Sequence, residues 1–180
     1  IKGSIPNILT LLNMSLGVVA ILLSVNSINN VNLLFTASLL VMIAALTDRL
    51  DGKVARMLGK TSDLGKELDS LADLISFGVA PIIIAWRISF IDFGIIGYIL
   101  ALIFPMAGAY RLARYNVTAF DNFFRGMPIT IAGAFLAINN LFNWYAYINN
   151  KISYTHSVIS AVLVILLSYF MICKIKVKKI

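Results

Sequence analysis

Six of the eight acidic residues of this chain fall between residues 48 and 77, directly after an apolar run. Successive residues of an α-helix turn by about 100°, so carboxylates three or four positions apart share one face. Two pairs have this spacing: Asp48 with Asp51, and Asp69 with Asp73. Asp63 and Glu67 point elsewhere. Two consecutive antiparallel helices could therefore bring four carboxylates together.

Four facing carboxylates repel one another unless a cation compensates their charge. Oxygen-only ligands favour a hard divalent ion, Mg²⁺ or Mn²⁺, with Ca²⁺ as a further candidate. Two such ions about 4 Å apart commonly support displacement at phosphorus. Gly52, Ala55 and Gly65 would leave room for a diphosphate, and Arg56 could neutralise it. We therefore expect a two-metal site that acts on a diphosphate.

Two other interpretations account for carboxylates beside an apolar run. Each aspartate taken alone could belong to a solvated rim at the membrane surface. The set could also form a cation transport site, as intramembrane carboxylates often do. However, the aspartates lie at the end of their helices rather than near the bilayer midplane, which favours interfacial chemistry.

The rest of the chain indicates a polytopic membrane protein. Its residues are 60% hydrophobic and 13% charged, with a mean hydropathy of +0.91, which is too apolar for a water-facing surface. Its apolar runs approach the ~20 residues that cross a bilayer. We predict an all-α fold, one membrane domain over residues 1–180, with Pro81 and Pro105 kinking two of six transmembrane helices. The expected helices span residues 7–25, 31–57, 63–88, 93–114, 128–146 and 157–173.

The basic residues give this membrane protein an orientation. With the N-terminus in the cytosol, only Arg87 and Lys151 of the 15 Lys and Arg fall on the outer side, which leaves 13 inside. This bias predicts that both termini and the aspartates lie on the cytosolic side of the cell membrane. It also explains the net charge of +7 without a nucleic-acid partner.

The carboxylate passage resembles the signature of the CDP-alcohol phosphotransferases at every fixed position. The matching residues, in order and at the family's spacing, are Asp48, Asp51, Gly52, Ala55, Arg56, Gly65, Asp69 and Asp73. The resemblance implies a homodimeric six-helix membrane enzyme. Such an enzyme transfers a phosphoalcohol group from a CDP-linked donor to an acceptor hydroxyl and releases CMP.

The resemblance also implies roles for these residues. Asp48, Asp51 and Asp69 would hold one metal ion. Asp48, Asp69 and Asp73 would hold the second. Asp73 would also act as general base. The residues expected to contact the CDP-lipid are Gly52, Ala55, Arg56 and Gly65.

Four further stretches resemble the phosphatidylserine synthase branch of the family: "IPNILTLLNMSLG", "GKELDSLADLISFGVAP", "RLARYNV" and "FRGMPITIAGA". This implies CDP-diacylglycerol or CDP-archaeol as donor and L-serine as acceptor. Glycerol 3-phosphate or an inositol phosphate is the alternative acceptor, and a divalent-cation transporter is the alternative class. The candidates for binding the acceptor or a phosphate are Arg111, Arg114, Arg125, Ser76 and Asn13. Each arginine could instead be a membrane anchor, and Asn13 could instead bond a neighbouring helix.

Overall fold

The computed structural model describes residues 5–57, 63–117, 123–173 and 176–178, with side chains described within 7–49, 63–117 and 126–173. Helices dominate this part of the chain, so the all-α prediction is confirmed. The α-helices are α1 (Ile5–Val25), α2 (Asn32–Met57), α3 (Asp63–Asp73), α4 (Ala80–Ala85), α5 (Ile95–Val117), α6 (Ile129–Ile148) and α7 (Tyr154–Ile172).

The third span combines α3 and α4 in one continuous helical rod. A π-helical segment, Leu74–Val79, joins them, and a second one, Trp86–Phe90, follows α4. A 3₁₀ turn, Ile91–Phe93, ends the rod. With this rod counted once, the described chain has the six long helices that the apolar runs predict.

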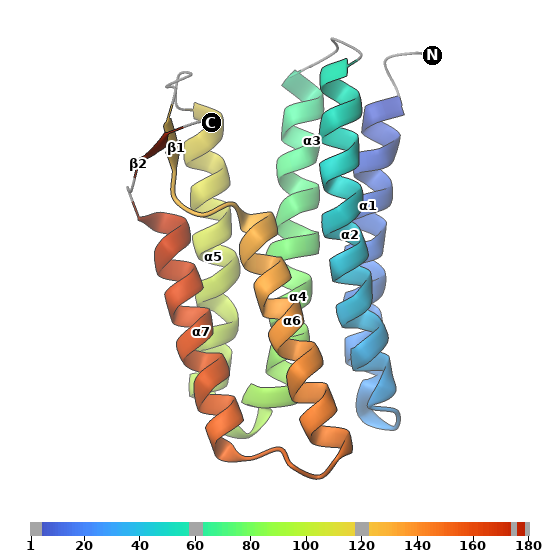
Figure 1. Ribbon diagram of the computed structural model, residues 1–180, viewed down its shortest axis with the longest axis vertical. Helices are drawn as coiled ribbons and strands as arrows, with labels where there is room; N and C mark the ends of the chain where they lie inside the picture. Colours follow the sequence, from blue (N-terminus) through green and yellow to red (C-terminus); the bar gives the residue numbers. More distant parts are fainter. Residues whose placement is uncertain (1–4, 58–62, 118–122, 174–175, 179–180) are drawn as a thin grey trace.

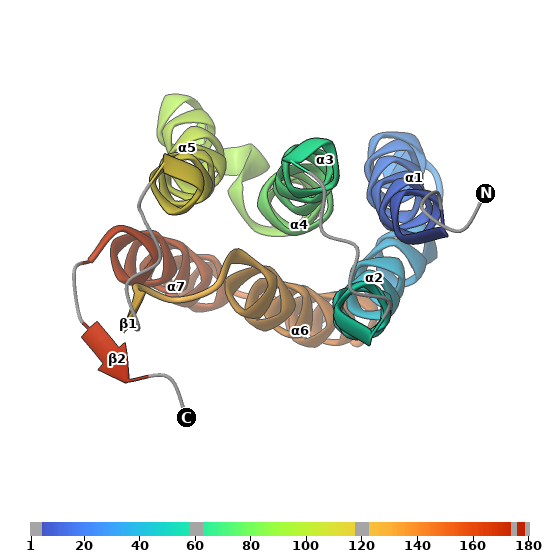
Figure 2. The same ribbon diagram turned by 90° about the horizontal axis from the view of Figure 1, so that it is seen from above.

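Seen from above, the six rods form two layers of three (Figure 2). One layer holds α1, the third span and α5, and the other holds α2, α6 and α7. Neighbouring rods in the chain run in opposite directions. As a result, the starts of α1, α3 and α6 lie at the same end of the bundle as the ends of α2, α5 and α7 (Figure 1).

Five of the rods are long and apolar enough to cross a membrane. They are Asn7–Ile28, Asn32–Arg49, Asp63–Phe93, Ile95–Val117 and Tyr154–Ile172. The sixth, α6, has 20 residues, but its asparagines lower its hydropathy. Many large apolar side chains face outward on these helices, as lipid contact requires. The chain is therefore a multi-pass membrane protein.

The third span is the most buried of the candidate spans, and irregular helix geometry accompanies Pro81. Proline has no N–H, so it cannot continue the regular helical ladder. The first π-helical segment comes just before it, and the Asn140 amide donates to the Pro81 carbonyl over 2.8 Å. Helix α5 continues through Pro105 without a break.

Two short strands lie beside the helix ends at the aspartate side of the bundle. Strand β1 (Phe123–Arg125) pairs antiparallel with β2 (Lys176–Lys178). The sequence prediction did not include this pair. Three-residue strands carry too little periodicity to be recognised, and their pairing depends on α6 and α7 bringing distant segments together.

Candidate active site

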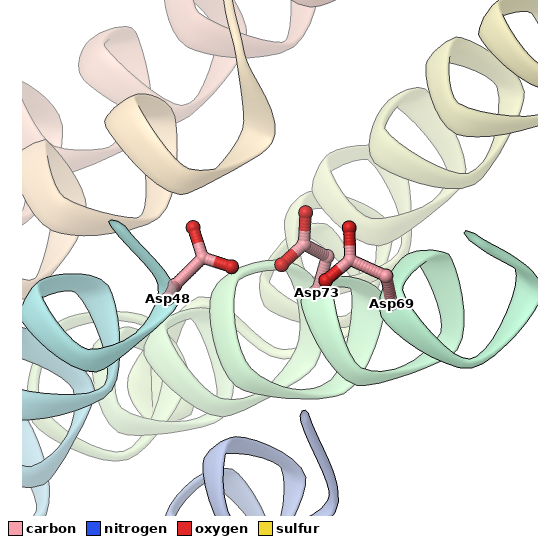
Figure 3. A group of neighbouring side chains, drawn as sticks. All are labelled: Asp48, Asp69 and Asp73. Atoms are coloured by element: carbon pink, nitrogen blue, oxygen red, sulfur yellow. The ribbon is translucent and has the colours of Figure 1, made fainter. Parts of the chain in front are cut away.

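Three aspartates converge from the C-terminal half of α2 and the last turns of α3. One carboxylate oxygen from each of Asp48, Asp69 and Asp73 lies within 4.8 Å of the other two. Asp69 and Asp73 stand one turn apart on α3, and Asp48 faces them from α2 (Figure 3). The Asp69–Asp73 pair expected from the helical spacing thus meets Asp48, one member of the other expected pair, in a single cluster.

The donor set of this cluster fits a divalent cation. All three ligands are carboxylates, which suit a hard ion such as Mg²⁺ or Mn²⁺. Asp48 and Asp73 are half-buried, and the Asp73 Oδ1 atom is buried without a hydrogen-bond partner in the described part of the chain. A buried acceptor of this kind needs a compensating donor or cation. The cluster therefore has the chemistry of a metal site.

For five predicted site residues, the structure describes the backbone but not the side chain. Asp51, Gly52, Ala55 and Arg56 lie within α2, and Arg125 lies within β1. Their side chains fall outside the described residues. The fourth metal ligand and most of the expected CDP contacts therefore remain predictions.

Arg111 on α5 brings positive charge to the cluster. Its side chain is buried, its Nε atom has no partner among the described residues, and its charge attracts the Asp73 carboxylate. No described carboxylate lies within the 4.0 Å ion-pair distance of this guanidinium. A buried arginine with unused donors is suited to bind a carboxylate or phosphate.

Arg114 lies one turn further along α5 and contacts a different element. One of its Nη atoms donates to the Ile172 carbonyl at the end of α7 over 2.9 Å, and its guanidinium lies 5.7 Å from the Tyr110 ring centre. The sequence made both arginines candidates for binding the acceptor or a phosphate. The structure relates Arg111 to the aspartates and Arg114 to α7.

Ser76 and Asn13 meet where α1 crosses the third span. The Ser76 hydroxyl donates to the backbone carbonyl of Asn13 over 2.9 Å, and both side chains are buried. The Asn13 amide has no partner for either of its polar atoms in the described chain. The Ser76 bond supports helix packing, and a contact of either residue with a substrate stays a prediction. Gly65 lies half-buried on the first turns of α3.

Two polar residues near the cluster were missed by the sequence interpretation. The Thr130 hydroxyl, in the first turn of α6, lies 3.4 Å from Asp48 Oδ2. The Asn116 amide at the end of α5 donates to Glu67 and Ser70 of α3 over 3.3 and 3.0 Å. Both lie in stretches quoted for the family resemblance, which was the only available signal. Their partners are too distant in sequence for spacing to indicate them.

Comparison with protein families agrees with this geometry. The profile of the CDP-alcohol phosphatidyltransferase family matches residues 3–173. The chain belongs to this family. The matched segment contains all eight signature residues, including the three clustered aspartates, so the predicted family membership is confirmed. The family generally depends on divalent cations, consistent with the carboxylate cluster.

Curated members of the CDP-alcohol phosphatidyltransferase family show the same similarity along most of the chain. An archaetidylserine synthase of Methanothermobacter thermautotrophicus is 37% identical over 79% of this chain and 60% of its own length. CDP-diacylglycerol–serine O-phosphatidyltransferases of Bacillus subtilis and Methanocaldococcus jannaschii are each 36% identical. The matches cover 96% and 98% of this chain, and 88% and 74% of those proteins.

Proposed function

We propose that this protein transfers a phosphatidyl group from CDP-diacylglycerol, or its archaeol counterpart from CDP-archaeol, to the hydroxyl of L-serine. The products would be the corresponding serine phospholipid and CMP. The observation that carries the proposal is the convergence of Asp48, Asp69 and Asp73 within the family signature. The names of the relatives in Bacillus, Methanocaldococcus and Methanothermobacter support serine as the acceptor.

The metal ligands follow from the cluster and the signature. Asp48, Asp51 and Asp69 would hold one divalent cation. Asp48, Asp69 and Asp73 would hold the other. Bound Mg²⁺ or Mn²⁺ would neutralise the diphosphate of the donor and the charge that develops on departing CMP. The aspartates must stay ionised side by side for this, so the protein without metal should bind the donor poorly.

The transfer step requires a base at the serine hydroxyl. Asp73 would accept the hydroxyl proton while the serine oxygen forms a bond to the phosphorus that carries the lipid. The bond from that phosphorus to the bridging oxygen breaks, and CMP leaves with its electron pair. Most of the catalysis is positioning and charge stabilisation, as expected for phosphoryl transfer.

Arg111 is the strongest candidate for the group that binds the serine carboxylate. Its buried guanidinium is close enough to attract the carboxylate of the proposed base, and its Nε has no described protein partner. Gly52, Ala55, Arg56 and Gly65 would contact the CDP portion of the donor. Further candidate contacts to the acceptor or a phosphate are Arg114, Arg125, Ser76 and Asn13.

The membrane arrangement fits a lipid donor. The aspartates lie on α3 and on the C-terminal half of α2, and the start of α3 and the end of α2 are at the same end of the bundle (Figure 1). A donor could therefore keep its chains in the bilayer and extend its diphosphate to the cluster. The excess of Lys and Arg at this end supports a cytosolic site and cytosolic termini. We further propose that the protein is a homodimer, as the family resemblance implies.

A CMP-release assay tests this proposal. Purified protein would be incubated with CDP-diacylglycerol and Mg²⁺ or Mn²⁺, with serine, glycerol 3-phosphate or inositol phosphate in separate reactions. We expect CMP release that depends on serine and on the metal. CMP release with glycerol 3-phosphate or inositol phosphate, but not with serine, would show that serine is not the acceptor. Divalent-cation flux in liposomes without CMP release would indicate a transporter and contradict an enzyme.

A further inference from the structure

The first turn of α6 reaches the aspartate cluster through Thr130. The Thr130 hydroxyl donates to Asp48 Oδ2 over 3.4 Å, which joins α6 to α2. The distance is long for a hydroxyl–carboxylate bond, so the contact is weak by itself, and its effect on Asp48 depends on how rigidly the turn holds Thr130.

Close contacts hold this turn against two neighbouring helices, α7 and α5. Met127 N donates to the Phe170 carbonyl of α7 over 2.9 Å. The Ile129 side chain packs so closely on Gly108 of α5 that a Cβ at Gly108 would lie 2.5 Å from Ile129 Cδ1. Such contacts leave the backbone around Thr130 little freedom to shift.

The two glycines of this segment account for how closely it approaches its neighbours. Gly126 has a positive φ of 80°, and a Cβ there would lie 2.5 Å from the Met171 carbonyl oxygen of α7. One turn after Thr130, a Cβ on Gly133 would lie 2.6 Å from the Phe77 carbonyl oxygen in the third span. Both separations are shorter than side chains tolerate. The first turn of α6 is thus fixed against α7, α5 and the helix that carries Asp69 and Asp73.

The backbone N–H groups at the start of α6 add an electrostatic field that favours a nearby carboxylate. Pro128 precedes the helix and gives no side-chain cap, so the first N–H groups of α6 keep their partial positive charge. Thr130 is the second residue of the helix, and its hydroxyl contact places Asp48 beside this end. A carboxylate is stabilised in such a position.

We propose that Thr130 is a positioning residue for the metal site and that it orients Asp48 for cation binding. A hydroxyl on Oδ2 fixes the plane of the carboxylate and directs its remaining lone pairs toward Asp69 and Asp73. Partners of this kind behind a metal ligand commonly affect metal affinity or activity by about 10- to 100-fold. This inference rests on the proposed metal site, but it does not depend on which acceptor the enzyme uses.

Direct Mn²⁺ binding tests the role of Thr130. Binding to detergent-purified protein would be followed by electron paramagnetic resonance, without donor or acceptor. Thr130→Val keeps the side-chain shape and removes the donor, so we expect its Mn²⁺ dissociation constant to rise about tenfold. Thr130→Ser keeps the donor and should stay within about twofold of wild type.

A matched control is Thr47→Val, one residue before Asp48. Among the described residues, the Thr47 hydroxyl bonds the Ile43 and Ala44 carbonyls of its own helix and no aspartate, so its loss should leave Mn²⁺ affinity unchanged. Thermal unfolding without metal shows whether each variant is folded, and Thr130→Ala replaces the valine variant if valine disturbs the turn. Wild-type Mn²⁺ affinity in both Thr130→Val and Thr130→Ala would overturn the proposal, as would an equal loss in Thr130→Ser.

The Mn²⁺ measurement separates this inference from the proposed function. If serine-dependent CMP release is absent but Thr130→Val still weakens Mn²⁺ binding, the substrate assignment fails and the positioning role holds. If CMP release is present and Thr130→Val leaves Mn²⁺ binding unchanged, the positioning role fails and the enzyme assignment holds.

Discussion

The carboxylates of Asp48 on α2 and Asp73 on α3 present ligand oxygens within 4.8 Å of each other. At this separation and an effective dielectric of about 20, two full charges repel by about 3 kcal/mol. Asp69 also has a carboxylate oxygen within 4.8 Å of those of Asp48 and Asp73, which adds to the repulsion. The folded chain therefore concentrates negative charge at one point, and a bound cation would relieve it.

Replacing Asp73 with asparagine should stop turnover while the protein still binds some donor. The amide cannot accept the serine proton, and loss of a general base commonly costs about 10²- to 10⁴-fold in rate. Serine-dependent CMP release measures the effect. Asp63→Asn is the matched control, because Asp63 is exposed and its ion pair in the described chain is with Lys66 over 3.7 Å, away from the cluster. Normal turnover by Asp73→Asn would show that another group is the base.

Mg²⁺ or Mn²⁺ should raise the melting temperature of the wild-type protein. A ligand at a hundred times its dissociation constant stabilises the folded state by about 2.7 kcal/mol. Asp48→Asn should lose most of this shift, since Asp48 belongs to both proposed metal sites. Thermal unfolding with and without chelator gives the comparison. An undiminished metal-induced shift in Asp48→Asn would remove Asp48 from the ligand set.

Arg111→Gln should raise the KM for serine at least roughly tenfold, equivalent to about 1.4 kcal/mol. The variant removes the buried cation beside Asp73, and Arg111→Lys should recover only part of the loss, because lysine cannot bind a carboxylate in two places. Arg87→Gln, at the far end of the third span, is the control. A rise in the KM for CDP-diacylglycerol with an unchanged KM for serine would reassign Arg111 to the donor phosphate.

Gly17→Ala should destabilise the protein by about 1–3 kcal/mol. A Cβ at this position would lie 2.6 Å from the Ser76 hydroxyl oxygen and 2.7 Å from Ser76 Cα, so α1 and the third span would have to separate. Thermal unfolding measures the loss, and Val18→Ala on the exposed side of α1 is the comparison. An unchanged melting temperature would mean that the two helices can move apart freely.

Asn143→Ala should lower stability by about 1 kcal/mol and leave CMP release unchanged. The Asn143 amide donates to Ser89 over 3.0 Å and to Ser160 over 2.7 Å, which joins α6 to the third span and α7. It lies about 20 Å along α6 from Thr130, by the helical rise. Asn149→Ala, which loses only a bond to the Tyr145 carbonyl, is the control. A fall in turnover without a loss of stability would link this network to catalysis.

The sequence allowed the helices and the aspartate cluster to be predicted because both depend on local periodicity. Apolar runs of bilayer length indicate the rods, and a spacing of four puts Asp69 and Asp73 on one stripe of α3. Asp48 was placed opposite them because consecutive membrane helices run antiparallel. These relationships involve neighbouring helices, where few arrangements are open to the chain.

Other features depend on contacts between distant segments. The meeting of Thr130 with Asp48 requires α6 to pack beside α2, which no local pattern specifies. Ser76 was a candidate for binding the acceptor, but the π-helical segment that begins after Asp73 changes the helical repeat there. Its hydroxyl donates to the Asn13 carbonyl of α1. Asn139 and Asn143 likewise find their partner on α7.

The pairing of β1 with β2 has a consequence for the order in which the protein is made. Strand β1 leads into α6, and its partner β2 follows α7 in the chain. During synthesis, the ribosome releases the aspartate-bearing helices well before β2, and chains generally fold from the N-terminal side first. The carboxylates can thus gather early, whereas the strand pair beside the entry to α6 forms only after α7 has been inserted.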